Sequence, residues 1–94
     1  MKPSEITAET VLGFLRLDEP PEDIPPEVLL AAAKGYAMSY TGLDEAGLDE
    51  HEDIALAILV LCSDLYDRRQ MAVESDKVNR VVQSILDLHA VNLV

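Results

Sequence analysis

The fold is decided by the stretch Asp53-Ile54-Ala55-Leu56-Ala57-Ile58-Leu59-Val60-Leu61-Cys62-Ser63-Asp64-Leu65-Tyr66, which is apolar on nearly every side of a helix. Its unbroken apolar run from Ile54 to Cys62 covers only nine residues, whereas a helix needs about 20 to cross a bilayer. We therefore expect no membrane-spanning segment here. A helix that is apolar all round must be covered by other helices, from its own chain or from neighbouring copies.

The boundaries of this central helix follow from its charged flanks. We expect Asp49 to be its N-cap and Glu52 to complete a capping box. The helix then continues past Tyr66 into Asp67, Arg68 and Arg69, where cations are favoured by the helix dipole.

A first helix is predicted near the N-terminus, over Ala8 to Arg16. Thr7 is a suitable N-cap, and Ile6 and Val11 are spaced to form a hydrophobic staple around it. The acidic segment that follows, residues 18–26, contains four prolines and is expected to be an extended connector.

A second helix is predicted to start at Pro25 or Pro26, because proline is favoured in the first turn. It should end near Thr41, since Gly42 can adopt the left-handed conformation and Leu43 can fold back on Met38, as in a Schellman motif. Its apolar residues recur at steps of three and four. They are Val28, Leu29, Ala32, Ala33, Tyr36, Ala37 and Tyr40.

The C-terminal part predicts one more amphipathic helix, from about Lys77 to His89, after a loop over residues 70–76. The residues of its apolar face are Val78, Val81, Val82, Ile85, Leu86 and Leu88. Residues 90–94 form an apolar extended tail. That tail is expected to rest either on a groove of an adjacent subunit or on its own core.

Composition supports an all-α fold. Nearly half of the 94 residues are hydrophobic, yet only three tyrosines and one phenylalanine are aromatic, and the surplus is aliphatic. A chain of this length forms one domain with one core. We therefore predict a single domain over residues 1–94, a small four-helix bundle with a central apolar third helix and an extended C-terminal tail.

The charge is strongly unbalanced, with 18 acidic and seven basic side chains and a formal net charge of −11. This charge repels a phosphate backbone and disfavours direct or sequence-specific nucleic-acid binding. The same excess is suited to a passage through which DNA slides without sticking. Charge sign alone does not distinguish that role from simple solubility.

Nothing in the sequence indicates an enzyme or a cofactor. Cys62 is the sole cysteine, lies in the apolar stretch and is interpreted as a small buried hydrophobe in a reducing cytoplasm. His51 lies among carboxylates, but these lack the spacing of a calcium loop or of a zinc site. His51 and His89 stand alone in the sequence and are expected to be separate surface residues, with no metal. We expect no secretory signal at the N-terminus.

The order of elements resembles the small head-tail connector (adaptor) proteins of long-tailed bacteriophages, a family found below the portal ring. Three stretches carry the resemblance. They are Ile6-Thr7-Ala8-Glu9-Thr10-Val11-Leu12-Gly13-Phe14-Leu15-Arg16-Leu17-Asp18, then Leu30-Ala31-Ala32-Ala33-Lys34-Gly35-Tyr36 leading to Tyr40-Thr41-Gly42-Leu43, and Ile54-Ala55-Leu56-Ala57-Ile58-Leu59-Val60-Leu61 leading to Leu65-Tyr66-Asp67-Arg68-Arg69.

This resemblance implies a structural virion protein at the head-tail junction, assembled in the host cytoplasm. It implies an all-helical protomer that forms a homo-oligomeric ring of about a dozen copies. The ring would contact the portal protein on one side and tail-completion proteins on the other, and DNA would pass through its centre.

Charge placement along the chain suggests how such copies would meet. Carboxylates gather before the central helix and cations after it, so a head-to-tail contact can pair one end with the other. Both groups are equally explained as solvated helix ends. The candidate interface residues are Asp49, Glu50, Glu52, Asp53, Arg68, Arg69, Lys77 and Arg80. The alternative function is a small acidic helical regulator or DNA mimic that binds a basic protein partner.

Overall fold

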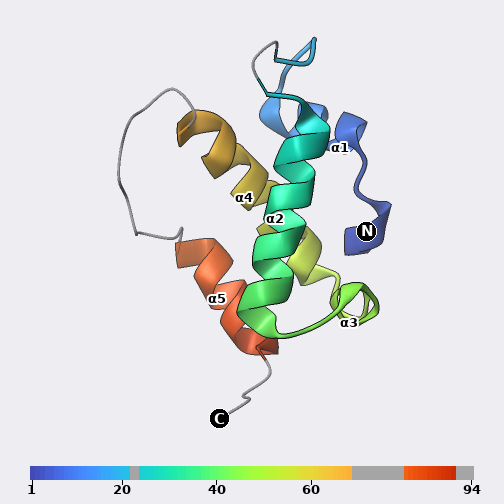
Figure 1. Cartoon of the computed structure of the whole chain (residues 1–94), viewed down its shortest axis with the longest axis vertical. Helices are drawn as coiled ribbons and strands as arrows, with labels where there is room; N and C mark the ends of the chain where they lie inside the picture. Colours follow the sequence, from blue (N-terminus) through green and yellow to red (C-terminus); the bar gives the residue numbers. More distant parts are fainter. Residues whose placement is uncertain (22–23, 69–79, 91–94) are drawn as a thin grey trace.

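The computed structural model describes residues 1–21, 24–68 and 80–90. These form a short 3₁₀ helix and five α-helices, shown in Figure 1. The elements are η1 (Pro3–Glu5), α1 (Ala8–Leu15), α2 (Pro26–Thr41), α3 (Glu45–Asp49), α4 (Asp53–Arg68) and α5 (Arg80–His89). The described residues contain no β-strand, so the predicted all-α fold class is confirmed.

Helix α4 is the centre of the fold, as its apolar sequence predicts. It contacts α1, α2, α5 and η1, and Ile54, Ile58 and Cys62 are fully buried along it. The described helices of its own protomer leave part of it uncovered, because Leu56 is 47% exposed. That neighbouring copies cover this part of α4 stays a prediction.

Helix α2 packs along α4 through a face of small residues. Ala33 and Ala37 are fully buried in the common core, and Leu29 lies with them. Alanine side chains let two helix backbones approach closely, which explains why the longest contact between helices in the described chain joins α2 and α4 (Figure 1). Two residues predicted on the buried face of α2, Val28 and Ala32, are exposed.

The predicted end of α2 is confirmed. Gly42 has φ 78° and its amide donates to the Met38 carbonyl, which is the left-handed stop that glycine favours. The second bond differs from a Schellman motif, because the Leu43 amide donates to Oγ1 of Thr41. The Thr41 hydroxyl in turn donates to the Ala37 carbonyl, so this buried side chain closes the last turn.

The N-terminal segment also follows its local chemistry. Oγ1 of Thr7 accepts a hydrogen bond from the Thr10 amide at 3.2 Å and caps α1. Ile6 and Val11 are both buried, as the predicted staple requires. The helix ends one residue before the predicted boundary, because Arg16 adopts the left-handed conformation with φ 59°.

The helix cap predicted in the acidic segment, residues 44–53, is wrong. Asp44, and not Asp49, caps a helix there: Oδ1 of Asp44 accepts from the Gly47 amide at 2.8 Å and starts the short helix α3. Asp49 is the last residue of α3, and α4 begins at Asp53. The predicted capping box between Asp49 and Glu52 is therefore wrong.

Helix α5 lies beside α2 and α4 and completes the core with Val82 and Leu86, both fully buried. The Tyr40 hydroxyl of α2 donates a hydrogen bond to the Asp87 carboxylate of α5. Leu88, predicted on the buried face, is 76% exposed. The predicted helical turn at residues 77–79, the loop at 70–76 and the tail beyond residue 90 lie outside the described residues.

In the ranges that the structure describes, no helix combines the length and the hydropathy that a bilayer crossing requires.

Candidate functional site

The carboxylates that precede α4 form one end of the molecule, called here the acidic end. It consists of Asp44, Glu45, Asp49, Glu50, Glu52 and Asp53. Asp44 is the N-cap of α3, and the others lie on α3, on the turn after it and at the first residue of α4. The structure thus brings the predicted acidic interface residues together, but it gives them different surroundings.

The Asp49 carboxylate accepts a hydrogen bond from within the chain. Its Oδ1 accepts a hydrogen bond from the Ser4 amide at 2.8 Å, which attaches η1 to α3. Hydrogen bonds from the Ser4 hydroxyl and amide lower the pKa of the Asp49 carboxyl below its usual value. Since that contact joins residues 45 positions apart, no local pattern could have revealed it.

The Asp53 carboxylate also has a polar partner within the chain. Nε2 of His89, the last residue of α5, lies 2.8 Å from both Asp53 carboxylate oxygens. The imidazole of His51 stacks on that of His89, with 3.9 Å between ring centroids and 23° between planes. The prediction that the two histidines are separate surface residues is therefore wrong, because the antiparallel course of α4 and α5 brings them together.

Glu50 and Glu52 are exposed to solvent, as is Asp53. Glu50 is exposed at the end of α3. The Glu52 side chain is 74% exposed and lies 3.8 Å from the N-terminal ammonium of Met1, too open a pair to contribute much free energy. An electrostatic contact with another molecule at this end would therefore involve Glu50 and Glu52 first.

The opposite end of α4 carries the described part of the predicted basic set. Arg68 is the last residue of α4, and Arg80 is the exposed first residue of α5. With a rise of 1.5 Å per residue, the 16 residues of α4 hold Arg68 about 22 to 24 Å from the acidic end. Arg69 and Lys77 lie outside the described residues.

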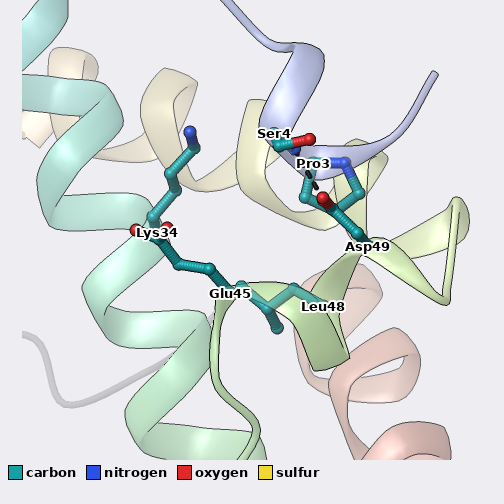
Figure 2. Close-up of a pocket in the computed structure, with 6 residues that line it drawn as sticks. All are labelled: Pro3, Ser4, Lys34, Glu45, Leu48 and Asp49. Carbon is teal, nitrogen blue, oxygen red and sulfur yellow. Dashed lines mark hydrogen bonds between the residues drawn. The ribbon is translucent and has the colours of Figure 1, made fainter.

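A small cavity lies between η1, α2 and α3, and Figure 2 shows its lining. Its volume is about 30 Å³, which is room for one water molecule. The lining residues are Pro3, Ser4, Lys34, Glu45, Leu48 and Asp49. The Ser4–Asp49 hydrogen bond lies at its edge, so this cavity is part of the contact that attaches the N-terminal segment. It is too small for an organic ligand.

A larger, open groove of about 360 Å³ follows the outer flank of α2 next to α3. Its lining residues are Glu27, Leu30, Ala31, Lys34, Gly35, Met38 and Glu45. The lining combines apolar or small residues with Lys34 and two glutamates. We call it the α2–α3 groove. Sequence interpretation did not identify it, because it depends on α3 standing beside α2.

Neither thiol chemistry nor metal chemistry has a site in the described chain. Burial raises the pKa of the Cys62 thiol to about 11, so the nucleophilic thiolate is scarce at neutral pH. Within residues 1–21, 24–68 and 80–90, no three histidine, cysteine or carboxylate side chains are grouped so that they could hold a metal ion.

The function is therefore inferred from surfaces and charge. Searches of protein-family models, of curated proteins and of solved structures return no match to this chain.

Proposed function

We propose that this protein is a structural subunit of a ring, with the role that its resemblance to phage head-tail connectors implies. Copies associate head to tail between a portal protein and tail-completion proteins, and DNA passes through the ring. The site of action is the head-tail junction of the virion, after assembly in the host cytoplasm.

The observation that carries this proposal is the separation of charge along α4. Glu50 and Glu52 are exposed near its N-terminal end. Arg68 is its last residue, after the exposed Asp67, and Arg80, the first residue of α5, is exposed. Two different, complementary surfaces on opposite sides of a protomer make a heterologous contact, which closes into a ring when the rotation between copies allows it.

The net charge of −11 agrees with a passage for DNA. A surface with this charge repels phosphates at short range, so DNA in the channel is not held by the counterion release that strengthens protein–DNA complexes. The contact between the acidic end of one copy and the basic end of the next still forms, because the charges that meet there are close together and opposite in sign.

Charge-swapped variants test the head-to-tail contact. The first variant, Glu50→Arg with Glu52→Arg, has two basic ends, and the second, Arg68→Glu with Arg69→Glu, has two acidic ends. Each variant alone is expected to lose self-association, because like charges meet at every contact. An equimolar mixture restores complementarity at every contact and is expected to assemble, as seen by sedimentation velocity and negative-stain electron microscopy.

Matched neutral variants separate this contact from general repulsion. Arg68→Gln with Arg69→Gln and Lys2→Gln with Arg16→Gln remove the same charge, but only the first pair lies at the basic end. We expect the first pair to weaken assembly and the second pair to leave it unchanged. A mixture of the swapped variants that stays monomeric, under conditions where the natural chain assembles, contradicts this contact.

A natural chain that stays monomeric and binds a basic protein points instead to the acidic regulator or DNA mimic. Electrostatic binding of that kind weakens as salt is raised.

A further inference from the structure

Two imidazole rings lie face to face at the acidic end of the molecule. The rings of His51 and His89 stack with 3.9 Å between their centroids and 23° between their planes. His51 lies between α3 and α4, and His89 is the last residue of α5. The stack therefore joins the end of α5 to the turn that carries Glu50 and Glu52, the carboxylates of the proposed head-to-tail contact.

The charge of this end depends on the two rings at mildly acidic pH. His51 and His89 are the two histidines of the chain. Histidine is the side chain whose charge ordinarily changes between about pH 5 and pH 8. Carboxylates ordinarily change charge near about pH 4, and an amino terminus near about pH 8. Between pH 7 and pH 5.5, positive charge is therefore added mainly on the two imidazoles.

The two rings have different charged neighbours. Nε2 of His89 lies 2.8 Å from both carboxylate oxygens of Asp53 at the start of α4, so a positive charge on His89 has an opposite charge in direct contact. His51 lies between Glu50 and Glu52 in the chain, and both of these glutamates are exposed. A positive charge on His51 is therefore placed beside the carboxylates that face solvent.

The other carboxylates on the neighbouring elements have donors of their own. Asp44 caps α3 through the Gly47 amide, and Asp49 of α3 accepts from the Ser4 amide of η1. Asp87 of α5 accepts from the Tyr40 hydroxyl of α2. The N-terminal ammonium of Met1 lies 3.8 Å from Glu52. The contact that links the two imidazoles to each other is the stack itself.

The sign of that contact depends on protonation. Stacked aromatic rings attract each other when they are neutral. Two imidazolium ions in the same position repel, and two like charges about 4 Å apart change an equilibrium constant by about fivefold even in bulk water. The stack therefore holds α5 against the turn before α4 at neutral pH, and it opposes the same arrangement when both rings are charged.

We propose that the His51–His89 stack is a pH-sensitive switch at the acidic end, which weakens the head-to-tail contact when the pH falls from 7 to 5.5. This inference rests on the proposed ring assembly and adds a condition that controls it. The added charge on His51 offsets the attraction of Glu50 and Glu52 for the basic end of the next copy. Acidification also lowers the general repulsion between copies, but physiological salt screens that effect beyond about 8 Å, so the local charge decides.

The first experiment measures the interaction between the two rings in the single chain, at a protein concentration at which it is monomeric. His51→Gln and His89→Gln each replace a ring that can be protonated by an amide that cannot. A double-mutant cycle measured by urea unfolding isolates the coupling of positions 51 and 89 from the effect of each ring on Asp53 and the glutamates. The coupling is expected to be favourable at pH 7. It should become less favourable at pH 5.5, by about three- to fivefold in the unfolding equilibrium constant. Equal coupling at the two pH values overturns the switch.

The second experiment measures self-association by sedimentation velocity at physiological salt. The association constant of the natural chain is expected to fall about fivefold between pH 7 and pH 5.5, as for one or two exposed charges at a contact. The matched control is the variant that carries both His51→Gln and His89→Gln. It has no imidazole, so its association constant should be nearly the same at both pH values. An equal fall in the natural chain and in this variant overturns the control of assembly by the stack.

The outcomes separate the switch from the proposed function. Coupling that stays the same at both pH values, in a chain that forms rings, overturns the switch and leaves ring assembly standing. Coupling that changes with pH, in a chain that is monomeric at every concentration tested, overturns ring assembly and with it the control of assembly by the stack.

Discussion

Nε2 of His89 lies 2.8 Å from both carboxylate oxygens of Asp53, so the last residue of α5 is bonded to the first residue of α4. A carboxylate at a helix N-terminus is favoured by the helix dipole, and an imidazole at a helix C-terminus is favoured when it is protonated. The pair is partly open to water, with side-chain exposures of 45% for Asp53 and 18% for His89. It therefore contributes a modest stabilisation and fixes the register of α5 on α4.

The first prediction concerns this pair. We expect Asp53→Ala and His89→Ala each to lower the free energy of unfolding by about 0.5 to 1 kcal/mol, as for partly exposed ion pairs. In a double-mutant cycle measured by urea unfolding, the two effects should not add, because the second substitution has no partner left to remove. Additive effects would show that the contact carries no coupling free energy.

The second prediction contrasts two residues of α4. Ile58 is fully buried and Leu56 is 47% exposed. Ile58→Ala should lower the free energy of unfolding by about 2 to 5 kcal/mol, because a cavity is left in the core. Leu56→Ala should cost less than about 1 kcal/mol. Equal losses in urea unfolding experiments would mean that Leu56 is buried in the protein as it exists in solution, as it would be in a subunit contact.

These two residues also show how far the sequence determines the fold. The apolar run identifies α4 as the central helix, and the glycine at position 42 and the threonine at position 7 identify helix ends, because these signals act between near neighbours in the chain. The open side of α4 at Leu56 was not predictable. It depends on how many helices surround α4, and periodicity in one helix contains no information about that number.

The prediction of the helix cap in the acidic segment was wrong for a related reason. Asp44 and Asp49 are both suitable N-caps by composition. In the structure Asp44 caps α3, whereas Asp49 accepts from the Ser4 amide, 45 residues away in the chain. The stacking of His51 on His89 and the α2–α3 groove likewise depend on tertiary placement. The predicted acidic residues do lie together at one end, but whether they and the arginines form a subunit contact stays a prediction.

The third prediction uses the bond between Ser4 and Asp49. Because this bond lowers the pKa of Asp49 in the folded state, it stabilises the fold above the ordinary carboxyl pKa, and the contribution is lost as pH falls through the folded-state pKa. Asp49→Asn should therefore flatten the fall in unfolding free energy between about pH 5 and pH 2. Glu50→Gln is the neighbouring control for the loss of one negative charge. If the free energy of unfolding falls equally with pH in the natural chain and in Asp49→Asn, Asp49 does not contribute to the loss of stability in acid.

The fourth prediction contrasts two glycines of the α2 region. Gly42 has φ 78°, whereas Gly35 lies inside α2 with open space around its Cβ position. Gly42→Ala should lower the free energy of unfolding by about 1 to 2 kcal/mol, because a side chain is strained in the left-handed region. Gly35→Ala should raise it by about 0.5 to 1 kcal/mol through better helix propensity. Thermal unfolding of the two variants should show midpoints shifted in opposite directions, and a shift in the same direction would contradict one of the two backbone assignments.

The fifth prediction concerns Cys62, whose side chain is fully buried in the core and whose thiol pKa is raised to about 11 by that burial. A disulfide reagent attacks through the thiolate, so both the scarcity of thiolate and the covering helices protect the residue. At neutral pH the folded natural chain should react only as fast as it unfolds, and the reaction should become rapid in urea. A Leu88→Cys variant is the comparison, because it adds one thiol at an exposed position. That added thiol should react with the reagent at once. Immediate reaction of the natural chain without urea would show that the core around α4 opens readily, and would contradict its place as the central helix of the fold.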